Sequence, residues 1–242
     1  DSAAAAPMVA PTADSAAAAS FARWTVHGAR ALAALVDSLG PERWTQVLAI
    51  NRVDAAHVRD RDTLVLPDRY GDSLAFAPFP RAWEELADSG KVVFVSRRVQ
   101  AFAAYDSGRL VRWGPVSTGR RSTPTPAGLY HATWKDRERV STVDDEWLLK
   151  WCVNIENREG VSLHQYELPG RPASHSCVRL AERDAMWVYA FCDRAPGKQP
   201  PAAAGAAARG ADELAAAQRV WRVGGRPEFG GDGSVATGNT QP

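Results

Sequence analysis

The heptapeptide Ser174-His175-Ser176-Cys177-Val178-Arg179-Leu180 carries most of the reactive side chains that this chain places close together. A free cysteine thiol has a pKa of about 8.5 and is mostly protonated at neutral pH, so a nucleophilic cysteine needs a base or a positive environment. His175 and Arg179 each lie two residues from Cys177, and in an extended chain alternate side chains share one face. The stretch therefore predicts a cysteine nucleophile in a cleft.

A second histidine, His164, ends the preceding strand candidate. A cysteine with a histidine nearby is typical of a cysteine enzyme. Two other interpretations fit the same local spacing, namely a zinc site whose fourth ligand comes from elsewhere and a coincidence within a structural β domain. The chain has no Cys-x-x-Cys pair, which disfavours the zinc interpretation.

The segments around the heptapeptide are rich in β-branched and aromatic residues, which favour strands. We expect strands at 92–95, 99–105, 110–116, 129–134, 147–154 and 161–164. The charged segment 135–146 is expected to be an exposed loop, and 181–191 has the periodicity of one amphipathic helix. Many short strands and one helix predict a mainly β fold of the β-sandwich or β-barrel type.

Residues 174–180 closely resemble the Ser-His-Gly-Cys-Ile/Val-Arg-Leu signature of YkuD domains, the catalytic domains of L,D-transpeptidases. The resemblance extends over about residues 92–193. It includes Ser117-Thr118-Gly119, the following Thr-Pro-rich stretch 123–128, the strand that bears His164 and the helix that contains Asp184 and Ala185. The resemblance implies a YkuD-type sandwich or barrel with one helix, and an enzyme that acts on peptidoglycan.

The resemblance also implies a role for each residue of the site. Cys177 is similar to the nucleophile that attacks the carbonyl between the third and fourth residues of a tetrapeptide stem, and His164 to the base that accepts the thiol proton. His175 helps to shape the site, and the backbone N–H groups of Ser176 and Cys177 form the oxyanion hole. The substrate-binding side chains implied are Arg179, Ser174 and Gln165.

In this chemistry a D-residue leaves, an acyl-enzyme forms on the cysteine, and an amine or water resolves it without a metal or an organic cofactor. Transfer to an amine makes the protein a peptidoglycan L,D-transpeptidase. The alternatives are a hydrolase of the L,D-carboxypeptidase or endopeptidase type on the same scaffold, or a cell-wall-binding protein with a degenerate cysteine site. Because the family's thiols open β-lactam rings, β-lactams of the carbapenem type are expected inhibitors.

Two residues depart from the family's usual pattern, which has glycine after the first histidine and glycine before the cysteine. This chain has Gln165 and Ser176 at those positions. Where the second position has a positive φ, serine costs on the order of 1 kcal/mol relative to glycine. The segment between His164 and His175 is also short for the family, which we expect to open the acceptor side.

A second resemblance lies nearer the N-terminus. A strand at 24–26, helices at 29–39 and 42–50 separated by Gly40-Pro41, and a strand at 63–66 are expected there. This βααβ order resembles a LysM module, a small binder of peptidoglycan and chitin. The matching residues are Val47 to Asn51 and Asp62 to Pro67. The alternative is a small helical spacer that binds nothing.

The patterns divide the chain into an Ala-rich flexible spacer (1–22), a LysM-like module (23–70), a linker (71–90), a YkuD catalytic domain (91–194) and a C-terminal tail (195–242). Because the chain begins at Asp1, we expect that a secretion signal has been removed and that the protein works outside the cytoplasm, in the periplasm or cell wall.

Composition narrows the partners. The 29 basic and 28 acidic residues give a net charge of +1 without a basic stripe, so nucleic acid is not expected. No apolar run approaches the ~20 residues of a membrane span. Peptidoglycan stem peptides and glycan strands remain the expected partners. Cys152 and Cys192 either pair in an oxidising compartment or, as we favour, are small buried hydrophobes.

Overall fold

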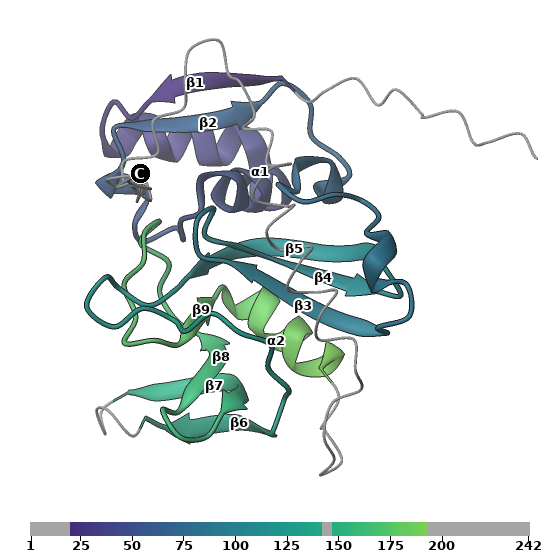
Figure 1. The fold of residues 1–242 in the computed structure, drawn as a ribbon. Coiled ribbons are helices and arrows are strands. Elements are labelled where there is room, and N and C mark those ends of the chain that lie inside the picture. Colours follow the sequence, from purple (N-terminus) through teal and green to yellow (C-terminus); the bar gives the residue numbers. More distant parts are fainter. Residues whose placement is uncertain (1–19, 142–146, 193–242) are drawn as a thin grey trace, which may run out of the picture.

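The computed structural model describes residues 20–141 and 147–192 (Figure 1). Its helices are α1 (Ala29–Asn51) and α2 (Glu182–Phe191), with short 3-10 turns at Val58–Asp60, Ser73–Phe76 and Glu84–Leu86. Its strands are β1 (Phe21–Thr25), β2 (Thr63–Pro67), β3 (Lys91–Ser96), β4 (Ala101–Asp106), β5 (Arg109–Ser117), β6 (Trp134–Val140), β7 (Leu148–Glu156), β8 (Val161–Gln165) and β9 (Val178–Leu180). None of the helices in these two ranges is long and apolar enough to cross a membrane. Most of the predicted spacer and all of the predicted tail lie outside the described residues.

Seven strands pair in the order β3-β4-β5-β9-β8-β7-β6, and every pair is antiparallel except β8–β9. Only two residue pairs join β5 to β9, so this junction links two larger halves. In Figure 1 the β3–β5 half lies above α2 and the β6–β8 half lies below it. The predicted mainly β fold is confirmed, and its two halves remain hydrogen-bonded to each other through the motif strand β9.

Strand β4 is buried on both faces, as its run of apolar residues requires. Phe102 and Ala104 face a cluster formed with α2, β5, β8 and β9. Ala101, Ala103 and Tyr105 face the opposite cluster, to which the segment 76–86 contributes. The β4–β5 turn at Asp106-Ser107-Gly108 has a positive φ of 48° at Ser107 and 75° at Gly108.

The charged segment 135–146 was expected to be a loop, but residues 135–140 belong to β6, and residues 129–133 contain no strand. Strand β6 is the edge of the sheet, where charged side chains are tolerated because one side faces water. The charged stems also cover aromatic rings, since the Arg139 guanidinium lies 4.5 Å from the ring centroid of Trp134. Residues 142–146 lie outside the described part.

Residues 71–90 are part of the core and not a free linker. Their aromatic residues Phe76, Phe79 and Trp83 are buried, and the Trp83 N–H donates to the Gly108 carbonyl at 2.7 Å. The Tyr105 hydroxyl donates to the Pro80 carbonyl at 2.9 Å. Residues 71–90 therefore form short turns, and their buried aromatic side chains pack on one face of the sheet.

The N-terminal part consists of the antiparallel pair β1–β2 and the helix α1, which is broken at Gly40 (φ 71°) before Pro41. Strand β1 begins at Phe21, so two residues assigned to the spacer belong to it. The buried Asn51 side chain donates to the Val65 carbonyl and accepts from the Val65 N–H, both at 2.8 Å. This amide therefore fixes the end of α1 to β2.

Residues 20–70 contact the rest of the protein directly. The Arg52 guanidinium donates to the Val99 carbonyl at 3.1 Å and lies 4.9 Å from the ring centroid of Trp113. Burial lowers the pKa of Arg52 to about 10, so it remains charged at neutral pH. Residues 20–70 are therefore packed against the rest of the protein as well as joined to it through residues 71–90.

Candidate active site

A pocket of about 420 Å³ lies beside the heptapeptide, against strands β7 and β8. Six of the seven predicted site residues line it, namely Cys177, His164, His175, Ser176, Arg179 and Ser174. Gln165 does not, because it follows His164 on β8 and its side chain therefore points to the opposite face. The backbone of Gln165 still contributes, as described below.

The pairing of β8 with β9 brings the cysteine and the histidine together. These strands are parallel, with His164 opposite Arg179 and Leu163 opposite Val178. Leu163 and Val178 face the core, so their neighbours in sequence face the pocket. Cys177 and His164 therefore stand on adjacent strands and on the same face of the sheet.

The surroundings of Cys177 favour the protonated thiol. Burial raises the pKa of Cys177, while the Ser162 backbone N–H and the charge of Arg179 act in the opposite direction and offset it only in part. The thiol contacts the Gly160 carbonyl, with Sγ 3.6 Å from the oxygen. Arg179 thus supplies part of the positive environment expected from the sequence, but burial outweighs it.

The His164 imidazole lies in the pocket in its neutral form. Its side chain is buried, and this desolvation, together with the charge of Arg179, lowers the pKa of His164 to about 4, although the hydrogen bond to Gln165 opposes the shift. Nδ1 lies 2.9 Å from the Gln165 carbonyl oxygen. A carbonyl can only accept, which assigns the proton to Nδ1 and leaves a lone pair on Nε2.

Within the described residues no hydrogen bond joins Sγ of Cys177 to the His164 ring. The resting pair is therefore a neutral thiol and a neutral imidazole, not a thiolate with an imidazolium. Such a pair reacts when the base accepts the thiol proton as sulfur attacks, and the catalytic hydrogen bond forms with substrate bound.

The hydroxyl of Ser174 stabilises the loop of the heptapeptide. Its Oγ accepts from the Ser176 N–H at 3.2 Å and donates to the Cys177 carbonyl at 2.5 Å. Ser174 is buried, and its hydroxyl is engaged inside the loop, while its predicted contact with substrate stays a prediction. The Ser176 N–H, which was expected in the oxyanion hole, is engaged by the same hydroxyl.

The Ser117-Thr118-Gly119 motif and the Thr-Pro-rich stretch 123–128 hold the heptapeptide in place through hydrogen bonds. Thr125 Oγ1 accepts from the Gly119 N–H at 2.9 Å and donates to the Ser176 carbonyl at 2.7 Å. A Cβ on Gly119 would lie 2.2 Å from the Thr123 carbonyl oxygen, so this approach requires glycine. These residues, noted in the sequence only as a signature, thus position the cysteine loop.

Two aromatic residues that the sequence analysis did not assign to the site, Trp147 and Tyr166, also line the pocket. The Tyr166 ring lies 4.4 Å from the Arg179 guanidinium and 6.1 Å from the His164 ring, measured to its centroid. The His175 ring lies 5.4 Å from that of Trp147. The signal for Tyr166 was available, because it lies two residues after His164 and so shares its face. The buried His175 Nδ1 has no hydrogen-bond partner within the described part of the chain.

Ser176 has a φ of 119°, a conformation that suits glycine. We expect Ser176→Gly to raise the free energy of unfolding by about 1 kcal/mol, because glycine removes the penalty of a Cβ at positive φ. Chemical denaturation of both proteins at equal concentration measures the change. Ser107→Gly, at another positive φ of 48° on an exposed turn, shows what the same relief contributes away from the active site. An unchanged or lower value for Ser176→Gly alone would contradict strain at this position.

Comparison with known proteins assigns a family to this part of the chain. Residues 90–209 match the model of the YkuD family, the L,D-transpeptidase catalytic domain. A search of curated proteins returned no match.

Several solved structures of L,D-transpeptidases are similar to the chain. One from Mycobacterium smegmatis is 21% identical (TM-score 0.39; 43% of this chain and 55% of that one), and L,D-transpeptidase 1 of Mycobacterium tuberculosis is 23% identical (0.38; 43% and 58%). One from Stackebrandtia nassauensis is 25% identical (0.42; 52% and 65%). The chain spans less than two thirds of each of these proteins. Over residues 90–209 the chain is therefore similar to the catalytic domain of the YkuD L,D-transpeptidase family.

Proposed function

We propose that this protein is a peptidoglycan L,D-transpeptidase that forms an acyl-enzyme on Cys177. The observation that carries the proposal is the placement of the Cys177 thiol and a neutral His164 on one face of the paired strands β8 and β9, inside one pocket. The hydrogen bond from Nδ1 to the Gln165 carbonyl leaves Nε2 able to accept a proton.

The reaction proceeds in two halves. Sγ attacks the carbonyl carbon between the third and fourth stem residues, and Nε2 of His164 accepts the thiol proton. The C–N bond then breaks, and the imidazolium returns the proton to the departing amine of the D-residue. In the second half an amine attacks the thioester, His164 accepts its proton, and the thiol of Cys177 is restored.

The oxyanion of each half lies near the backbone N–H groups of Ser176 and Cys177. The Ser176 N–H is bound to Ser174 Oγ, so we propose that substrate binding releases it from that hydroxyl. Ser174 then acts indirectly, by holding the loop in the free enzyme. The role of a substrate-binding side chain passes to Arg179, which reaches the pocket.

The charges of the pocket suit an acidic donor peptide. Among the described residues that line it, three are arginines, Arg139, Arg158 and Arg179, and one is a carboxylate, Glu159. Stem peptides carry free carboxylates, so the excess of cationic side chains favours them. The same thiol and pocket support the proposal that carbapenem-type β-lactams acylate Cys177 and inhibit the enzyme.

Residues 20–70 are proposed to be a LysM-like module that contacts glycan strands, and the protein is proposed to work outside the cytoplasm. The support for the module is the order of its elements, a strand, two helical segments broken at Gly40, and a second strand that pairs with the first. The proposal for its location rests on the substrate, because peptidoglycan is assembled outside the cytoplasm.

The test separates transfer from hydrolysis. The enzyme is incubated with a tetrapeptide stem and an excess of an isotope-labelled D-amino acid, and the products are weighed by mass spectrometry. We expect the labelled residue to replace the fourth residue, because an ordered acceptor competes with water for the acyl-enzyme. Tripeptide without exchange, even at high amine concentration, would establish the hydrolase as the function. An unchanged tetrapeptide would support the degenerate site.

A further inference from the structure

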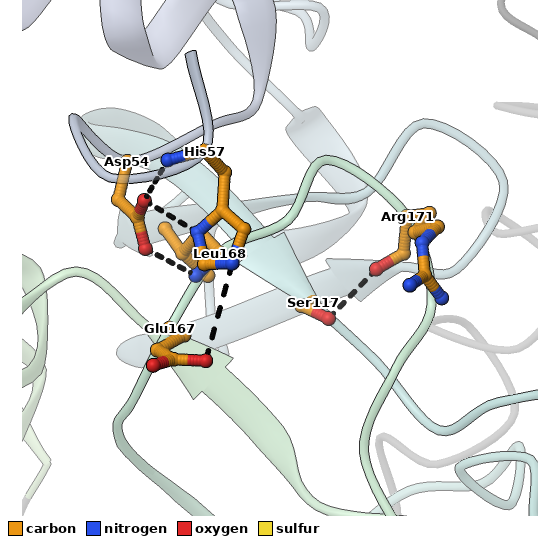
Figure 2. A network of polar contacts seen from close by, with 6 residues as sticks. All are labelled: Asp54, His57, Ser117, Glu167, Leu168 and Arg171. Atoms are coloured by element: carbon orange, nitrogen blue, oxygen red, sulfur yellow. Dashed lines mark hydrogen bonds and ion pairs between the residues drawn. The ribbon is translucent and has the colours of Figure 1, made fainter. Parts of the chain in front are cut away.

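The segment 165–174, which connects His164 to the heptapeptide, is held by the N-terminal part of the chain. Figure 2 shows the centre of this contact, where Asp54 meets Leu168. One Asp54 carboxylate oxygen accepts from the Leu168 N–H at 2.7 Å, and the Asp54 N–H donates to the Leu168 carbonyl at 3.0 Å. A single residue thus binds both backbone groups of Leu168.

The Asp54 carboxylate is itself fixed. Its other oxygen accepts from the His57 N–H at 3.0 Å and from His57 Nδ1 at 2.7 Å, and His57 Nε2 lies 4.0 Å from a Glu167 oxygen (Figure 2). Burial acts to raise the pKa of Asp54, but the hydrogen bonds from Leu168 and His57 outweigh it and lower that pKa. The acceptor is therefore a charged carboxylate, whose hydrogen bonds are stronger than neutral ones.

The next two residues of the segment are bound by the same part of the chain. Val53 forms an antiparallel bridge with Pro169, and Arg61 Nη2 donates to the Gly170 carbonyl at 3.1 Å. Gly170 has a φ of 76°, and a Cβ there would lie 1.8 Å from the Arg61 guanidinium. The contact therefore requires glycine at this position, as a close-fitting surface does.

The contact leads directly to the pocket. Tyr166, two residues before Leu168, lines the pocket beside Arg179 and His164. The Tyr166 backbone N–H donates to the Leu180 carbonyl at 3.1 Å, so the backbone of Tyr166 is also fixed to β9. Holding Leu168 in place thus limits where the Tyr166 ring, and with it the Arg179 guanidinium, can lie.

We propose that Asp54 is a positioning residue for the active site, which binds Leu168 and thereby fixes Tyr166 against Arg179 and His164. The N-terminal part of the chain is then a structural component of the active site, in addition to any contact with glycan. The expected effect of Asp54 on turnover rests on the proposed function. Its expected effect on the segment 165–174 does not.

The test compares Asp54→Ala with Asp54→Asn in the full chain. Asparagine retains an oxygen that accepts from the Leu168 N–H, whereas alanine retains none. For Asp54→Ala we expect amide exchange at Leu168 to accelerate roughly tenfold or more, since a hydrogen bond to a charged group is lost. We expect kcat/KM for the tetrapeptide to fall roughly ten- to a hundredfold, because a small displacement of active-site residues by a distant substitution has an effect of this size. Asp54→Asn keeps the acceptor for the Leu168 N–H but places an NH2 group against the His57 N–H, so it is expected to lie between wild type and Asp54→Ala in both.

Asp60→Ala is the control, because Asp60 is an exposed carboxylate on the same part of the chain. Intact-mass alkylation of Cys177 counts the folded active sites, so a variant that only folds less well loses amplitude without a change in kcat/KM per site. Normal kcat/KM per site in Asp54→Ala would overturn the proposal, and so would unchanged exchange at Leu168. If wild type does not convert the tetrapeptide, the proposed function fails by itself. The alkylation rate of Cys177 then decides, with a slower rate in Asp54→Ala expected and an equal rate overturning the inference.

Discussion

Cys177→Ala is expected to abolish turnover of a tetrapeptide stem, with product below detection by mass spectrometry. The reason is chemical, since Cys177 is the only thiol of the heptapeptide, and it immediately precedes β9 and lines the same pocket as His164. The variant is also expected to lose the covalent adduct that a carbapenem forms with wild type, as read by intact mass. Ser176 and Ser174 lie nearby, but their hydroxyls have no base positioned for them.

The matched controls are Cys152→Ala and Cys192→Ala, which remove the other two cysteines of the chain one at a time. Cys152 is the stricter control, since it lines the same pocket. Burial raises the pKa of Cys152 to about 11, so at neutral pH this thiol is less reactive still. Both controls should retain turnover and the adduct. Activity in Cys177→Ala that disappears with Cys152→Ala would transfer the nucleophile to β7.

The site could be predicted from the sequence because its residues alternate along two short strands. His164 and the heptapeptide were placed in one cleft by spacing and by family resemblance, and β8 and β9 do place them on one face. The same rule, applied one step further, would have excluded the Gln165 side chain and included Tyr166. What alternation could not supply was the use of the Ser174 hydroxyl inside the loop, because that depends on a turn with positive φ at Ser176.

Long-range contacts were the part that local patterns missed. Residues 71–90 contain prolines, as linkers often do, yet Phe76, Phe79 and Trp83 are buried against β4. This burial depends on the surface of β4, which local sequence does not reveal. Strand β6 was missed because charged residues at a sheet edge have the composition of a loop. The contact between Asp54 and Leu168 joins residues that are 114 positions apart, and neither belongs to a recognisable motif.

His164→Gln is expected to lower kcat roughly a hundredfold or more, the range for loss of a general base. Glutamine is chosen because its amide N–H can still donate to the Gln165 carbonyl, which keeps the loop in place while removing the basic nitrogen. His175→Gln is the control, since the His175 ring packs on Trp147 and its Nδ1 has no partner in the described residues. A larger loss of kcat in His175→Gln than in His164→Gln would shift the base to His175.

The pH dependence of stability tests the same residue without substrate. The pKa of His164 is about 4 in the folded protein, below the value of about 6.5 for an unfolded histidine, so the unfolded chain binds more protons between these values. Stability from this group is therefore fully present above pH ~6.5 and is lost as the pH falls towards ~4. Wild type should lose more unfolding free energy between pH 7.5 and 5 than His164→Gln does. Equal losses in the two proteins would mean that His164 is not held neutral, and a neutral imidazole is what the proposed proton transfer requires.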